Sequence, residues 1–254
     1  LSFEDLHIQF TLRGQVLKAI RGISLDVYRG ESLAIVGESG SGKSVFTKSA
    51  MGLLDANGTI AGGHIWYDGR DLAQFKTEKE WLSVRGKEIA MVMQDPMTSL
   101  NPLKSVGDQI LEAVVLHQGL KGAAAKAAAV DALRAVGIDQ PERRYKQYPH
   151  EFSGGMRQRV VIAIAVACRP KILICDEPTT ALDVTIQAQI LDLIKNLQKQ
   201  LDLTTIYITH DLGVVANVAD RIAVMYAGDI VEVGRCDEVF YTPKHPYTWA
   251  LLSS

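Results

Sequence analysis

The stretch Gly37-Glu38-Ser39-Gly40-Ser41-Gly42-Lys43-Ser44 decides the fold of this chain. The apolar residues 32–36 before it predict a strand, and residues from about 43 to 53 predict a helix. A glycine-rich turn between a strand and a helix directs backbone N–H groups and a helix N-terminus at one point, which suits an anion. We expect Lys43 to reach the β- and γ-phosphates of a nucleotide and the Ser44 hydroxyl to bind Mg²⁺. The candidate phosphate contacts are Gly37, Ser39, Gly40, Ser41, Gly42, Lys43 and Ser44.

A second candidate follows the apolar run 172–175, where Asp176 and Glu177 stand next to each other. Ligands of open α/β sheets bind at the carboxyl ends of the strands. We expect Asp176 to hold Mg²⁺, directly or through water, and Glu177 to act as general base on the attacking water. Alone, the pattern is weak, because buried strands often end in an aspartate that has no function.

Composition excludes several classes of protein. The chain has 254 residues, 22% of them charged, and a formal net charge of -2, so a broadly basic nucleic-acid binder is not expected. Its longest apolar run is the nine residues 160–168, whereas a spanning helix needs about 20, and no signal peptide is visible. Cys168, Cys175 and Cys236 lack CxxC spacing and are interpreted as small hydrophobic residues in a reducing compartment.

The remaining pattern is extended first, then helical, then alternating. Asp68-Gly69 is a hairpin-type turn, and Gly137 is a good helix C-cap. Alternating strands and helices predict a parallel sheet, interrupted by a helical insertion at about 96–170. The predicted strands are 2–10, 16–27, 32–36, 64–67, 89–93, 171–175, 204–209 and 222–226; the predicted helices are 43–53, 123–136, 154–168 and 184–200.

A third motif is Phe152-Ser153-Gly154-Gly155-Met156. A serine at a helix start, followed by two glycines, is either an anion site or an ordinary N-cap. With this motif the sequence resembles the ATP-binding cassette family, whose signature is LSGGQ or a close variant. Phe152 replaces the leucine and Met156 the glutamine, while the distance of 23 residues from Ser153 to Asp176 is the one this family shows.

The resemblance covers about residues 2–254 and implies the fold. It is an α/β P-loop NTPase (RecA-like) core with an antiparallel β subdomain and an inserted helical subdomain. We expect one ATP-binding domain over 1–254. Within it, residues 1–95 and 171–234 form the nucleotide-binding core, 96–170 the helical signature lobe, and 235–254 the start of a C-terminal extension.

Further landmarks are assigned by the resemblance alone. Gln94 resembles the glutamine whose amide binds Mg²⁺ or water, and His210 the switch histidine at the γ-phosphate. Asp183 resembles the D-loop aspartate that crosses to a partner's site. Phe10, with Arg13 close by, is the candidate for adenine stacking, and a plain core role for Phe10 is the alternative. The signature residues Ser153, Gly154 and Gly155 are implied to act in trans, on ATP held by a second cassette.

Three stretches resemble a subgroup, the ATPase subunits of bacterial oligopeptide, dipeptide and nickel importers, and most closely the first ATPase subunit of Gram-positive oligopeptide importers. The stretches are 94–102, 179–185 and 245–248. The resemblance implies ATP and Mg²⁺ as ligands and a peripheral place on the cytoplasmic face of the cell membrane. It implies as partners a second ATPase subunit, expected to differ from this one, two permeases and an extracellular peptide-binding protein, with no contact to cargo or nucleic acid.

The alternatives differ in class. The same role in a dipeptide or nickel importer is the nearest one. ATPase heads of DNA-maintenance proteins share these motifs but interrupt the core with a long coiled coil, and the insertion here, about 75 residues, lacks sustained heptads. Soluble tandem cassettes that act on ribosomes have two cassettes and a basic linker, and this chain has one cassette.

Overall fold

The chain folds into two compact units. The computed structural model describes residues 1–254, apart from the side chain of Pro96. Unit 1 comprises Leu1–Ser83 and Thr204–Ser254, and unit 2 comprises Val84–Leu203. The subdomain boundaries expected from the sequence stay a prediction.

Unit 1 contains an antiparallel sheet with strand order β2-β1-β4-β5. Its first hairpin and the end of β4 agree with the predicted extended segments, whereas β5 was not predicted. Asp68 and Gly69 both have positive φ, of 50° and 78°, as a two-residue hairpin turn requires. β4 begins earlier than predicted because its first residues pair with β1, with Gly58 opposite Phe10. The strands are β1 (Ser2–Leu12), β2 (Gln15–Asp26), β4 (Gly58–Tyr67) and β5 (Arg70–Asp71).

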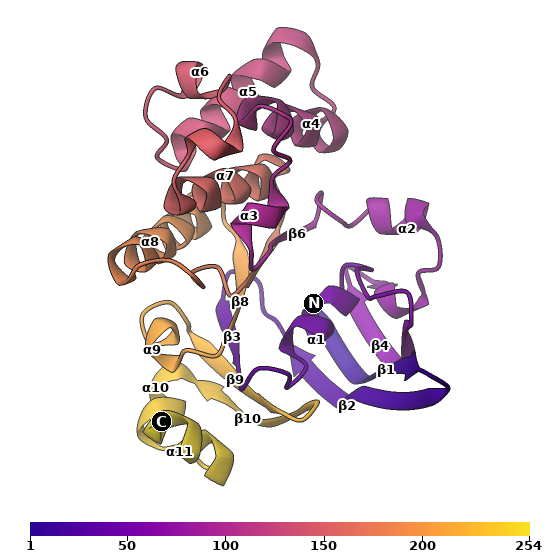
Figure 1. Cartoon of the computed structure of the whole chain (residues 1–254). Helices are drawn as coiled ribbons and strands as arrows, with labels where there is room; N and C mark the ends of the chain where they lie inside the picture. Colours follow the sequence, from indigo (N-terminus) through magenta and orange to yellow (C-terminus); the bar gives the residue numbers. More distant parts are fainter. The chain divides into compact units, whose positions relative to one another are not determined.

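Unit 1 also contains strands of a mixed sheet in the order β10-β9-β3-β8 (Figure 1). β3 (Ser32–Val36) pairs in parallel with β8 (Thr204–Thr209) and β9 (Arg221–Tyr226), which confirms the predicted parallel arrangement. β10 (Asp229–Arg235) is antiparallel to β9 and was not predicted. Most of its residues are only half-buried, so it lacks the apolar run that marks the inner strands.

The first helix, α1 (Lys43–Ser49), is shorter than the predicted 43–53. Gly52 has φ of 66°, and the Leu53 N–H donates to the Lys48 carbonyl oxygen at 3.1 Å, a bond that closes a helix end. A Cβ on Gly52 would lie 2.4 Å from the Trp81 ring, so the glycine is also required by packing. The other helices of unit 1 are η1 (Leu72–Gln74), α2 (Glu78–Leu82), α9 (Leu212–Val215), α10 (Cys236–Tyr241) and α11 (Pro246–Ser253).

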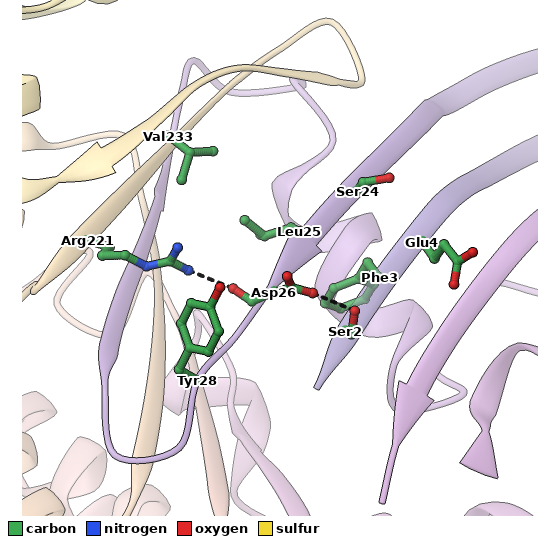
Figure 2. Close-up of a pocket in the computed structure, with 9 residues that line it drawn as sticks. All are labelled: Ser2, Phe3, Glu4, Ser24, Leu25, Asp26, Tyr28, Arg221 and Val233. Atoms are coloured by element: carbon green, nitrogen blue, oxygen red, sulfur yellow. Dashed lines mark hydrogen bonds between the residues drawn. The ribbon is translucent and has the colours of Figure 1, made fainter. Parts of the chain in front are cut away.

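Arg221 joins the two sheets of unit 1 at the pocket in Figure 2. Its guanidinium donates to the carbonyl oxygen of Asp26 at 2.6 Å and pairs with Glu31 at 3.0 Å. The same group lies 4.8 Å from the centre of the Tyr28 ring. These contacts fix the end of β2 against the start of β9.

Unit 2 contains two parallel strands and a group of helices, of which α4, α5 and α7 pack together (Figure 1). The buried face of α5 is Ala125, Ala129 and Leu133, and small side chains there allow close helix packing. The predicted ends of α5 and α7 agree within a residue, and α8 agrees at both ends. The elements are β6 (Ile89–Val92), α3 (Pro96–Ser99), α4 (Val106–Gln118), α5 (Gly122–Ala135), α6 (Pro141–Arg144), η2 (Pro149–Glu151), α7 (Gly154–Ala167), β7 (Ile172–Asp176) and α8 (Val184–Gln200).

The structure confirms that Cys168 and Cys175 are buried, whereas Cys236 is only half-buried. Both buried cysteines are free, and burial raises the pKa of the Cys168 thiol to about 11. Among the described residues, none of the helices combines the length and the apolar composition that crossing a membrane requires.

Candidate nucleotide-binding site

The loop between β3 and α1 has the backbone geometry that its glycines predict. Gly40 and Gly42 have φ of 83° and 103°, values that side chains other than glycine rarely adopt. Gly37 is required for another reason, because a Cβ there would lie 2.3 Å from the Met225 carbonyl oxygen of β9. The loop is therefore held against β9 at its start and turns sharply before the helix begins.

Lys43 lies folded into this loop, with only 6% of the residue exposed. Its Nζ donates to the carbonyl oxygens of Gly37 and Glu38, at 2.7 and 2.8 Å, and lies 3.4 Å from Ser41 Oγ. An ammonium group has three donors, and phosphate oxygens attract it more strongly than neutral carbonyls do. Ser44 follows it on α1, half-buried.

His210 lies at the same sheet edge as the loop. Val36 of β3 pairs in parallel with Thr209 of β8, so Gly37 and His210 leave adjacent strands side by side. His210 is exposed, and the Asp211 carboxylate accepts from the Gly213 N–H at 2.9 Å, which caps α9.

Phe10 and Arg13 occupy the hairpin of β1 and β2. The half-buried Phe10 ring packs over Gly58 of β4, where a Cβ would lie 2.7 Å from the ring. Arg13 is exposed in the turn with φ of 50°. The β2 residues beside the loop are Ala19 and Ile20, whose atoms lie 3.3 and 3.0 Å from a Cβ placed on Gly42.

In unit 2, the acidic pair and Gln94 lie at the ends of adjacent parallel strands, with Asp176 as the last residue of β7. Val92 of β6 pairs with Cys175 of β7, so the residues after each strand leave at one edge. Asp176 is buried at 4% exposure, whereas Glu177 is half-buried with φ of 45°. Gln94 is exposed. The roles expected of Asp176 and Glu177 stay a prediction.

Ser153 caps α7, since its Oγ accepts from the Met156 N–H at 3.3 Å. Ser153 therefore acts as a helix N-cap, and Ser153 and Gly154 are also exposed, so the anion site stays a prediction. Gly155 packs against α8, where a Cβ would lie 2.7 Å from the Ile186 side chain, and Gly154 lies beside Leu182. The structure thus brings the signature residues together with the turn that contains Asp183, the N-cap residue of α8.

The sequence predictions did not include Tyr247 as a contact of the loop. Its phenolic oxygen accepts a hydrogen bond from the Glu38 backbone N–H at 3.1 Å. The one signal in the sequence was the stretch 245–248, which resembles the importer subgroup. A contact over 209 positions of the chain has no local pattern.

A family model described as "ABC transporter" matches residues 20–180. The chain belongs to the ABC transporter family. Relatives of this ABC cassette include the oligopeptide transport ATP-binding proteins AmiE of Streptococcus pneumoniae and OppD of Bacillus subtilis, 59% and 60% identical. The dipeptide transport ATP-binding protein DppD of Bacillus subtilis is 54% identical. Each match covers 100% of this chain and 72%, 71% and 76% of the respective relative.

Among solved structures, the dimeric ATP-binding cassette MJ0796 in a post-hydrolysis state bound to ADP and Pi resembles this ABC cassette with a TM-score of 0.80. The two are 25% identical, and the match covers 92% of this chain and 98% of that one. The resemblance expected from the motifs and the P-loop NTPase fold are both confirmed.

Proposed function

We propose that this ABC cassette is the ATP-hydrolysing subunit that powers import of oligopeptides through a bacterial transporter. The observation that carries the proposal is its identity of 59–60% with AmiE and OppD over the whole chain. The motif residues lie at strand ends and helix starts within each unit, which supports the proposal.

Phosphate binding is assigned to the loop of unit 1. The Lys43 ammonium is proposed to exchange its carbonyl partners for β- and γ-phosphate oxygens, and the N–H groups of Gly40, Gly42 and Ser44 to bind the same anion. Ser41, whose N–H donates to the Glu38 carbonyl oxygen at 3.2 Å, is assigned to the same site. Gly37 and Ser39 are assigned to this group as well. Phe10 and Arg13 are the candidates for adenine, through a flat apolar face and a cation.

The donor set proposed for the metal is the Ser44 hydroxyl, the Gln94 amide oxygen and the Asp176 carboxylate. Hard oxygen donors with few carboxylates fit Mg²⁺, which keeps several waters and is shared with substrate phosphates. The described residues contain no group of three or more His, Cys, Asp or Glu that fits a metal, so a softer centre has no support there. Bound Mg²⁺ supplies neutralisation of the phosphate charge.

Hydrolysis is assigned to Glu177. Its carboxylate takes a proton from water while the water oxygen attacks the γ-phosphorus, and the bond to the β-phosphate oxygen breaks to release ADP and phosphate. His210 donates to the γ-phosphate and orients the water, and Gln94 senses the same group. The more exposed position of Glu177, compared with Asp176, leaves it accessible to water.

The partner in the reaction is a second cassette. Ser153, Gly154 and Gly155 are proposed to contact ATP held by that partner, and Asp183 to cross to its site. Ser153, Gly154 and Asp183 are exposed at the starts of α7 and α8, which supports this role, and Gly155 is half-buried. The partner is proposed to be a different ATPase subunit, and two permeases and an external peptide-binding protein complete the importer. This cassette then lies peripherally on the cytoplasmic face of the membrane and touches no cargo.

Uptake measurements test the cargo. In a strain that lacks this gene, labelled oligopeptide, dipeptide and nickel uptake are measured after complementation with wild type or Lys43→Ala. We expect the wild type alone to restore oligopeptide uptake. Restoration of dipeptide uptake only would favour the dipeptide alternative, which DppD supports at 54% identity. Restoration of nickel uptake only would contradict a peptide cargo.

A further inference from the structure

The phosphate loop is held from outside by the C-terminal part of unit 1. The Ser41 carbonyl oxygen accepts from the Gly228 N–H at 2.9 Å, and the Glu38 N–H donates to Tyr247 Oη at 3.1 Å. These two bonds lie on either side of Ser39 and Gly40, which are exposed. The first bond comes from the β9–β10 turn and the second from α11.

The Tyr247 phenol is fixed in place by contacts of its own. The Tyr247 ring packs on the Tyr226 ring with centroids 4.7 Å apart, and the backbone N–H of Tyr247 donates to His245 Nδ1 at 3.0 Å. The Glu232 carboxylate of β10 accepts from the N–H groups of Lys244 and His245 at 3.0 and 2.8 Å, which anchors the start of α11. Burial raises the pKa of Tyr247, so the phenol stays neutral at physiological pH.

We propose that Tyr247 is a positioning residue for ATP binding: its hydroxyl holds the Glu38 N–H and so keeps the phosphate loop in its binding geometry. The inference rests on the proposed binding of nucleotide at this loop. A loop fixed beforehand loses less conformational freedom when phosphate binds, so it binds more tightly.

Tyr247→Phe tests the hydroxyl alone, since the ring and its packing on Tyr226 remain. Tyr226→Phe is the matched control, because it removes the hydroxyl of the other tyrosine in the same ring pair. Hydrogen exchange of the Glu38 amide in the full-length, nucleotide-free protein is the direct readout. We expect faster exchange in Tyr247→Phe, no change in Tyr226→Phe, and equal thermal midpoints. Glu232→Ala, which releases the start of α11, should also speed exchange at Glu38.

ATP titration of the same proteins gives the second readout. One hydrogen bond corresponds to about a threefold to tenfold rise in the Kd for ATP in Tyr247→Phe. In the assembled transporter, KM for ATP should rise by a similar factor while kcat at saturating ATP stays unchanged. An unchanged Glu38 exchange rate, an unchanged Kd or an equal rise in Tyr226→Phe would overturn the inference.

The two proposals fail in different ways. If wild type and Lys43→Ala both fail to bind ATP, the proposed function is wrong, and Glu38 exchange still decides whether Tyr247 holds the loop. If wild type binds ATP, Lys43→Ala does not, and Tyr247→Phe binds as wild type does, only the positioning role is wrong.

Discussion

Val36 and Thr209 pair across the parallel strands β3 and β8, and each directly precedes a predicted site residue. Gly37 and His210 therefore leave the sheet at one edge, although 173 positions separate them in the chain. The carboxyl edge of a parallel sheet collects such residues because every strand runs in the same direction. The same relation holds in unit 2, where Val92 pairs with Cys175.

Lys43→Ala should abolish ATP binding. The ammonium is buried in the loop with two backbone carbonyls as partners, and charge-assisted bonds to phosphate are about twice as strong as neutral ones. Calorimetric titration with ATP measures the loss directly. ATPase activity near the wild-type rate in the assembled transporter would contradict the assignment of the phosphate loop.

Glu177→Gln should retain ATP binding and lower turnover by about 10²–10⁴-fold, the usual contribution of a general base. The change is nearly isosteric and leaves Asp176 in place. Glutamine at position 177 would have the same positive φ of 45° as the glutamate it replaces, so the substitution adds little strain to the turn. Steady-state ATPase and size-exclusion chromatography with ATP measure the effect, and a stabilised dimer is expected. Turnover at the wild-type rate would show that another group activates the water.

Ser153→Arg should leave this chain's own ATP binding unchanged and block hydrolysis at the partner's loop. The variant also removes the N-cap of α7, which costs about 1 kcal/mol. Ser105→Ala is the matched control, because Ser105 caps α4 in the same way, through the Asp108 N–H at 3.2 Å. It should lower stability equally without an effect on hydrolysis. Loss of ATP binding by this chain itself would mean that Ser153 acts in cis.

Gly37→Ala should destabilise the protein by about 1–3 kcal/mol, the usual cost of overpacking, and weaken ATP binding. The new methyl group would lie 2.3 Å from the Met225 carbonyl oxygen, a backbone atom that moves little. Gly30→Ala is the control: its φ of 81° makes alanine strained, yet its Cβ meets no atom within 4 Å. It should cost about 1 kcal/mol with ATP affinity intact. Thermal unfolding and ATP titration distinguish the two variants. Equal ATP affinities of Gly37→Ala and Gly30→Ala would contradict the role of Gly37.

His64 and Asp71 should make stability depend on pH. Their side chains are joined at 2.7 Å, and the hydrogen bond to Asp71 raises the pKa of His64 above 6.5. Burial opposes ionisation of Asp71, but hydrogen bonds from His64 and from two backbone N–H groups outweigh it, so its pKa lies below 3.8. The stabilisation from protonated His64 is complete below pH 6.5 and is lost as pH rises through the raised pKa of the folded state. The stabilisation from ionised Asp71 is complete above pH 3.8 and is lost as pH falls through the lowered pKa of the folded state.

The pair therefore contributes most between these two values. Thermal midpoints of wild type and Asp71→Asn should differ more at about pH 5.5 than at about pH 8.5. A difference that is the same at both pH values would show that protonation of His64 does not contribute.

The sequence by itself determined the local features of this protein. The phosphate loop, the Asp68-Gly69 hairpin and the bounds of α8 follow from glycine conformation and from short-range periodicity, which neighbouring residues set. The family was also readable from the sequence, because its motifs are short and their order along the chain is visible. α1 was predicted four residues too long, since a helix pattern continues past Ser49 while packing of Trp81 on Gly52 stops it.

Tertiary structure alone decided which distant residues surround the loop. Met225 sets the space available to Gly37, Gly228 binds Ser41, and Tyr247 binds Glu38. β10, which precedes α11, was invisible in the pattern because its half-exposed residues lack an apolar run. Such contacts depend on pairing register and on the path of the chain after β9, and neither leaves a periodic trace in the sequence. The residues that position the phosphate loop are therefore known only once the chain has folded.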